Sequence, residues 1–201
     1  MSTFVRSVVA AAAAMALAPT VSATVLTFDD LPGTLGAVPS NYGGLDWSGG
    51  AWFYFGTVQD PYTPHSDPNR AFVNPIAPDS ATAIGFASPT SFQGAWIAGN
   101  GTGDLNGQPV TVTVTFQLYL AGSLVHTSAS LIPSNVPTFL DSGYAGMVDE
   151  VIVSSPFQGF YAMDDFTYGQ PVTQVPEPTT YGFMLLGLGV VGWVARRRGT
   201  R

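Results

Sequence analysis

The sequence predicts an all-β protein, an antiparallel β-sandwich of jelly-roll-like order, flanked by an N-terminal signal helix and a C-terminal single transmembrane helix. Three observations lead to this fold class. Short runs of alternating or β-branched residues recur between residues 24 and 170. Glycine and proline interrupt the same region every few residues, and no helical period is sustained in it. Both ends of the sequence carry an apolar stretch close to arginine.

Residues 1–23 have the layout of a secretory signal peptide. Arg6 supplies the charge, residues 8–18 are apolar, and the segment closes on Val21, Ser22 and Ala23. Cleavage is expected after Ala23, which would make Thr24 the first residue of the mature chain. The alternative is a buried alanine-rich helix. The terminal position of the segment, directly before a strand-like sequence, disfavours this alternative.

The β-sandwich is expected over residues 24–170, with about nine short strands. They cover residues 24–28, 45–55, 70–73, 81–86, 91–98, 110–120, 123–131, 147–153 and 159–168. The clearest strand has the sequence VTVTVTFQLYL, which places Val110, Val112, Val114, Phe116, Leu118 and Leu120 on one face. Residues 121–123 then turn the chain into a hairpin. Residues 40–50 and 60–69 are rich in glycine or proline and are expected to be loops.

The charge of this region excludes some partners. Between residues 24 and 170 there are twelve acidic residues and one cation, Arg70. Nucleic acids bind to clustered lysine or arginine, so no nucleic-acid partner is expected, and divalent cations are the better candidates. Cysteine is absent from the sequence, which excludes disulfides, thiolate nucleophiles and sulfur-ligated zinc.

Two acidic pairs are candidate metal ligands: Asp29, Asp30, Asp164 and Asp165. They lie near the ends of the expected first and last strands, which often adjoin in a closed sandwich. Converging carboxylates would suit a structural calcium ion. Adjacent strand residues point to opposite faces, so only one member of each pair would enter such a site unless the strand ends there. The alternative is ordinary solvated carboxylates.

Four aromatic residues are candidate ligand-binding groups that could stack on sugar rings: Trp47, Trp52, Tyr54 and Trp96. In the sequence WFYF, Trp52 and Tyr54 share one face of a strand, and Phe53 and Phe55 share the other. One pair is therefore expected in the core. Core packing is the alternative reading for all four candidates.

No catalytic function is expected. The sequence contains no G-x-S-x-G, P-loop or H-E-x-x-H motif. His65 and His126 are expected to be surface polar residues. The enzymatic alternative is a glycosidase that pairs Glu150 with Asp149 or Asp165, because two carboxyl groups suffice for that chemistry. No cofactor beyond the possible calcium ion is expected.

The C-terminal segment has three parts in a fixed order. Residues 171–180 form a linker that contains Pro176, Glu177 and Pro178, residues 181–195 are apolar, and residues 196–201 begin with the basic stop Arg196, Arg197 and Arg198. A bilayer needs about 20 apolar residues, so this span is short, although the preceding threonines and the arginine stems extend it. The arginines should stay cytoplasmic, which leaves the large domain outside the inner membrane.

This order resembles the PEP-CTERM sorting signal of Gram-negative bacteria, which is also catalogued as an ice-binding protein C-terminal domain. The resemblance implies that an exosortase recognises Pro176, Glu177 and Pro178 and cuts near them. It further implies an inner-membrane anchored precursor that is then released to the cell surface or extracellular matrix. A permanent single-pass anchor is the alternative.

A second resemblance concerns the middle of the chain. The succession of LTFDD, FQGAWIAG, VTVTVTFQLYL, GMVDEVIVSS and FYAMDDFTY is similar to galactose-binding-like and carbohydrate-binding jelly rolls. It implies extracellular polysaccharide as a partner and a structural calcium between the opening and closing strands. The alternative is a structural surface or matrix protein without a specific ligand.

Overall fold

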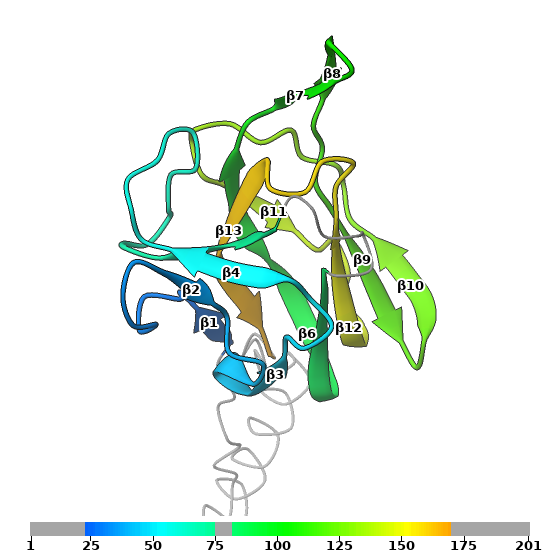
Figure 1. Ribbon diagram of the computed structural model, residues 1–201. Coiled ribbons are helices and arrows are strands. Elements are labelled where there is room, and N and C mark those ends of the chain that lie inside the picture. The colour runs from blue at the N-terminus through cyan, green and yellow to red at the C-terminus, as the bar shows by residue number, and fades with distance from the viewer. Residues whose placement is uncertain (1–22, 75–81, 170–201) are drawn as a thin grey trace, which may run out of the picture. The chain divides into compact units, whose positions relative to one another are not determined.

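The computed structural model describes residues 23–74 and 82–169 (Figure 1). The chain divides into two compact units, Met1–Gln170 and Pro171–Arg201, and every described residue belongs to the first. The expected signal peptide (except Ala23), linker, transmembrane segment and basic tail lie outside the described residues. Within the described part, no helix has the length and apolar composition that a membrane crossing requires.

Strands are the dominant regular structure of the described residues, which confirms the predicted all-β class. One short 3-10 turn, η1, interrupts the strands. The elements are β1 (Thr24–Leu26), β2 (Leu35–Ala37), η1 (Tyr42–Gly44), β3 (Leu45–Asp46), β4 (Trp52–Phe55), β5 (Arg70–Val73), β6 (Ala83–Gly99), β7 (Thr102–Leu105), β8 (Gln108–Thr111), β9 (Thr115–Leu120), β10 (Ser123–Thr127), β11 (Thr138–Asp141), β12 (Met147–Ser154) and β13 (Tyr161–Tyr168).

The long strand β6 joins the two halves of the sandwich (Figure 1). Its first half pairs antiparallel with β12 and β3, and β12 continues to β9 and β10. Its second half pairs with β13 and β11, and β13 continues to β5, β4 and β2. Strand β1 pairs with β13, as expected for the opening and closing strands. All these pairings are antiparallel, consistent with the predicted β-sandwich.

Side chains from both halves meet in one hydrophobic core. The ring of Phe92 on β6 packs against Phe116 on β9 and Phe166 on β13, with ring centroids 4.9 and 4.7 Å apart. Burying an aromatic or aliphatic side chain of this size contributes about 1.5–3 kcal/mol. Aromatic packing between β6, β9 and β13 therefore holds together the two halves that β6 connects.

The predicted buried face of residues 110–120 is confirmed at its four central positions, while Val110 and Leu120 are half-buried, and the predicted single strand is wrong. Val112, Val114, Phe116 and Leu118 are all fully buried. The chain nevertheless breaks between β8 and β9, and β8 pairs with β7 in a separate two-stranded hairpin. Conversely, the strands expected at 81–86 and 91–98 are one continuous strand, β6.

Candidate functional site

The outer face of β2, β4 and β5 carries a row of large side chains. Antiparallel register places Leu35 opposite Phe55, and Phe55 opposite Arg70. The neighbouring row contains Phe53 and Phe72, again opposite each other. Because strand residues alternate between faces, Trp52 and Tyr54 point into the core and Phe53 and Phe55 point away from it.

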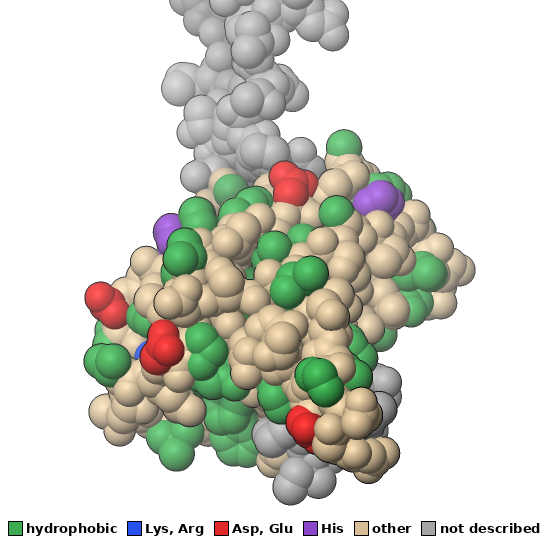
Figure 2. Space-filling view, turned by 90° about the horizontal axis from the view of Figure 1, so that it is seen from above, with side chains coloured by type: hydrophobic (Ala, Val, Ile, Leu, Met, Phe, Trp, Pro, Cys, Tyr) green, Lys and Arg blue, Asp and Glu red, His purple; other side chains and the backbone are tan. Residues whose placement is uncertain are grey.

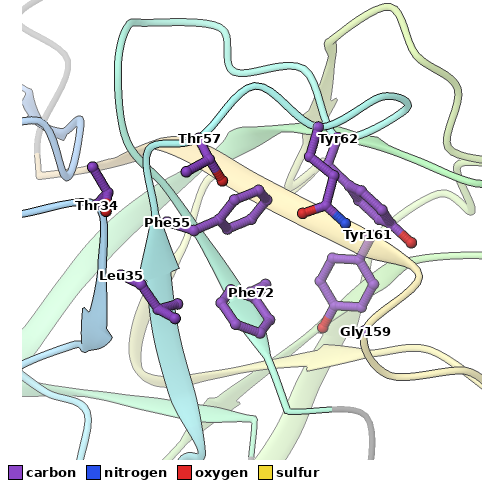
Figure 3. Close-up of a pocket in the computed structure, with 9 residues that line it drawn as sticks. Thr34, Leu35, Phe55, Thr57, Tyr62, Phe72, Gly159 and Tyr161 are labelled. Atoms are coloured by element: carbon purple, nitrogen blue, oxygen red, sulfur yellow. The ribbon is translucent and has the colours of Figure 1, made fainter.

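An aromatic pocket lies on this face (Figure 3). It has a volume of about 420 Å³, and Figure 3 shows its aromatic rings and threonine side chains around a common space. The lining residues are Thr34, Leu35, Phe55, Thr57, Gln59, Tyr62, Phe72, Gly159 and Tyr161. Phe55 packs edge-on against both Tyr62 and Phe72, with interplanar angles of 76° and 87°. The rings therefore form a corner, with the polar groups of Thr34, Thr57 and Gln59 beside it.

Arg70 supports the Phe55 ring, which lines the aromatic pocket. Its guanidinium lies 3.8 Å from the centroid of the Phe55 ring, and its Nη2 donates a hydrogen bond to the Thr57 carbonyl at 2.8 Å. The side chain is only 1% exposed. Desolvation lowers the pKa of Arg70, and the nearby carboxylates of Asp164 and Asp67 oppose this shift. Arg70 thus supports Phe55 and is not itself accessible to a ligand.

The structure corrects the predicted set of ligand-binding aromatics. Trp47 and Trp52 are each 2% exposed and Tyr54 is 5% exposed, so all three belong to the core. Trp96 is half-buried, and the imidazole of His65 stacks on it with ring centroids 3.6 Å apart. None of the four lines the aromatic pocket. Its rings come from Phe55 on the opposite face of the WFYF strand, from Tyr62 in an expected loop, and from Phe72 and Tyr161 in expected strands, none of which was predicted to bind a ligand.

One predicted acidic pair, Asp164 and Asp165, holds the loop that connects β4 to β5, residues 56–69. Asp164 Oδ2 accepts hydrogen bonds from the backbone N–H groups of His65 and Ser66, both at 2.8 Å. Asp165 Oδ2 lies 2.5 Å from His65 Nδ1, and its Oδ1 accepts a hydrogen bond from the Ser66 hydroxyl at 2.9 Å. We call this group, His65, Ser66, Asp164 and Asp165, the loop clasp.

A bulge in β13 lets both carboxylates reach the same loop. The register between β13 and β6 shifts between Asp164 and Thr167, and Asp165 has a φ of 47°. A regular strand would send the two side chains to opposite faces, whereas a residue in the left-handed region re-aims its side chain. The bulge therefore allows the carboxylates of Asp164 and Asp165 to bind the same loop.

The first acidic pair acts at other points. Asp29 Oδ1 accepts a hydrogen bond from the backbone N–H of Asn69 at 2.8 Å, at the far end of the same loop. Asp30 Oδ1 instead accepts one from the Tyr42 hydroxyl at 2.6 Å. The four carboxylates therefore do not converge as predicted. Across residues 23–74 and 82–169, no group of three or more His, Cys, Asp or Glu side chains is arranged to hold a metal ion.

Burial in the loop clasp changes the acidity of one carboxyl group. Desolvation raises the pKa of Asp164 from its ordinary 3.8 to about 7, and the neighbouring Asp165 carboxylate adds to the increase. The hydrogen bonds from the backbone of Ser66, Asp165 and His65 oppose this increase in pKa.

The surface in Figure 2 shows acidic side chains as separate spots and only a trace of the colour of basic side chains.

Comparison with known proteins identifies the C-terminal segment. Residues 174–198 match the family model of the PEP-CTERM protein-sorting motif. Neither the curated proteins nor the solved structures contain a significant match to the chain. The matched residues include Pro176, Glu177 and Pro178 together with Arg196, Arg197 and Arg198. The chain is thus a protein with a PEP-CTERM sorting motif, exported toward the cell surface and processed by an exosortase.

Proposed function

We propose that the β-sandwich is a non-catalytic polysaccharide-binding module, which the sorting motif delivers to the cell surface or extracellular matrix. Before processing, residues 181–195 anchor the precursor in the inner membrane, and the following arginines remain cytoplasmic. The aromatic pocket is the observation that carries the binding function.

The chemistry of the pocket suits a sugar ring. Ligand pockets are commonly about 300–1,000 Å³ in volume, mostly apolar, with a few polar groups that fix orientation. The pocket of about 420 Å³ combines the rings of Phe55, Tyr62 and Phe72 with the polar side chains of Thr57 and Gln59. The C–H face of a sugar packs on aromatic rings, and its hydroxyl groups find hydrogen-bond partners on the polar side chains.

The experiment is a pull-down of the purified protein on a panel of insoluble and immobilised polysaccharides. Tyr62→Ala removes a half-buried ring of the pocket and is expected to weaken retention about tenfold, equivalent to about 1.4 kcal/mol. Tyr119→Ala is the matched control, because Tyr119 is a half-buried residue of β9, outside the pocket lining. Equal retention of the Tyr62→Ala variant and the wild type would rule out the pocket as the binding site.

A second candidate function is a structural surface protein without a specific ligand. The burial of Trp47, Trp52 and Tyr54 favours it, since these rings are core residues and not a stacking platform. The same pull-down separates the two candidates. Absence of retention on every polysaccharide would support the structural role.

A further inference from the structure

A second hollow lies inside the loop of residues 56–69, next to the aromatic pocket. It has a volume of about 270 Å³, and its lining includes Val58, Asp60, Thr63 and Asp67. Gln59 lines both hollows, while Thr57 lines only the aromatic pocket and Val58 only the second hollow. The segment 57–59 is therefore the shared wall between two adjoining spaces.

The two hollows differ in chemistry. The aromatic pocket offers ring faces, whereas none of the aromatic residues that the structure describes lines the second hollow. Its polar lining includes Asp60, Asp67 and Thr63, set among apolar residues such as Val58. Ionised carboxylates only accept hydrogen bonds, so they favour a ligand rich in donors, such as sugar hydroxyls. Hydrogen bonds to charged groups are stronger than those between neutral groups.

The charges of the second hollow disfavour an anionic ligand. Arg70 is the only lysine or arginine among the described residues, and it lines the second hollow while remaining 1% exposed. Its guanidinium already contacts Phe55 and the Thr57 carbonyl. A uronic acid or sulfated sugar would meet Asp60 and Asp67 without an accessible cation, and like charges repel.

We propose that the two hollows form a single site for a neutral oligosaccharide of at least two sugar units. The aromatic pocket receives one ring, and the second hollow receives the hydroxyl groups of the next unit along the glycan. This inference rests on the proposed polysaccharide-binding function and specifies its ligand: uncharged, and longer than a monosaccharide.

The experiment is isothermal titration calorimetry on the purified full-length chain. The probes are cello-, xylo- and chito-oligosaccharides of one to six units, with oligogalacturonides of equal length as the anionic series. The expected result is an affinity that rises about tenfold between one and two or three units and then levels off, the equivalent of one charge-assisted hydrogen bond. The oligogalacturonides are expected to bind more weakly than every neutral series of equal length that binds.

Two variants test the second hollow directly, and a third is their control. Asp60→Ala and Thr63→Val, which removes only a hydroxyl, should abolish the increase in affinity with oligosaccharide length and leave the affinity for the monosaccharide unchanged. Glu150→Ala is the control, since it removes the same charge as Asp60→Ala from β12, away from both hollows. Circular dichroism checks that each variant is folded.

The outcomes separate this inference from the proposed function. If monosaccharides and oligosaccharides bind equally and Tyr62→Ala abolishes both, the aromatic pocket binds sugar but the two-unit site is wrong. If oligogalacturonides bind more tightly than the neutral series, the inferred ligand class is wrong. If no sugar binds at all, the proposed function fails and this inference fails with it.

Discussion

The imidazole of His65 lies face to face with the indole of Trp96, with ring centroids 3.6 Å apart and an interplanar angle of 10°. His65 comes from the loop between β4 and β5, and Trp96 comes from β6, so this stack fastens the loop to the sandwich. The other edge of the imidazole is held by Asp165. Because the same loop supplies Gln59 and Tyr62, the loop clasp sets the shape of the aromatic pocket.

The first prediction concerns the contribution of His65. His65→Ala removes both the stack on Trp96 and the hydrogen bond to Asp165, and is expected to lower the free energy of unfolding by about 1–3 kcal/mol. The measurement is equilibrium unfolding in urea, followed by tryptophan fluorescence. His126→Ala is the control: His126 stacks on Tyr144 at the longer distance of 5.4 Å, so a smaller loss is expected. Equal losses in the two variants would contradict a special role of the His65 stack.

The strand pattern of the sequence predicted the fold class because the alternation between faces is a local property. The burial of Val112, Val114, Phe116 and Leu118 follows directly from it. Strands β2, β7 and β11 were missed because their residues lack this alternation and are held by their neighbours. Strand β11, for example, is defined by its pairing with β6 from Gly94 to Ile97. Such pairing between distant segments depends on tertiary structure, which a single sequence does not display.

The candidate site could be predicted only in part. The pairs Asp29–Asp30 and Asp164–Asp165 were predicted as metal ligands because of their acidic pairing. In the structure Asp29, Asp164 and Asp165 instead accept hydrogen bonds from the loop of residues 56–69. Asp30 accepts one from Tyr42. Because adjacent strand residues normally point to opposite faces, Asp164 and Asp165 were not expected to reach the same partner. The bulge at Asp165 changes the direction of its side chain and makes this possible. For Trp52 and Phe55, the sequence indicated opposite faces but could not tell which face was the core.

The second prediction concerns the pH dependence of stability. Because burial raises the pKa of Asp164 to about 7, the folded protein keeps a proton that the unfolded chain releases near its ordinary value of 3.8. The stabilising contribution of Asp164 to the free energy of unfolding is therefore fully present below about pH 4 and is lost as the pH rises through about 7. Around the carboxyl lie Asp165, Arg70 and the backbone N–H groups of His65 and Ser66. For one proton, the free energy of unfolding changes by at most about 1.4 kcal/mol per pH unit.

Asp164→Asn tests this assignment. The amide oxygen can still accept the hydrogen bonds from the loop, but the side chain no longer titrates. The free energy of unfolding is measured in urea between pH 5 and 8. It should fall as the pH rises in the wild type, and it should fall less steeply with pH in the Asp164→Asn variant. Asp46→Asn is the control: hydrogen bonds from Ser48 lower the pKa of Asp46, so it titrates below this range. An identical slope in wild type and Asp164→Asn would refute the raised pKa.

The third prediction compares two glycines with positive φ. Gly94 in β6 has a φ of 144°, and a methyl group there would collide with the Leu140 carbonyl oxygen and the Phe139 ring of β11. Gly107 in the turn between β7 and β8 has a φ of 78° and open space around its missing side chain. Both alanine variants bear the cost of the left-handed backbone, about 1–2 kcal/mol. Only Gly94→Ala must also push β11 away from β6.

Gly94→Ala is therefore expected to lose more than about 3 kcal/mol of unfolding free energy in urea, and Gly107→Ala about 1–2 kcal/mol. The effect should extend to the loop clasp, because Phe139 of β11 packs edge-on against Trp96, and Trp96 also stacks on His65. A displaced Phe139 would let the indole tilt, and the fluorescence of the folded Gly94→Ala variant should shift relative to Gly107→Ala. Similar losses for both variants would mean that β11 moves aside without cost, and that the spacing between β6 and β11 does not constrain Trp96.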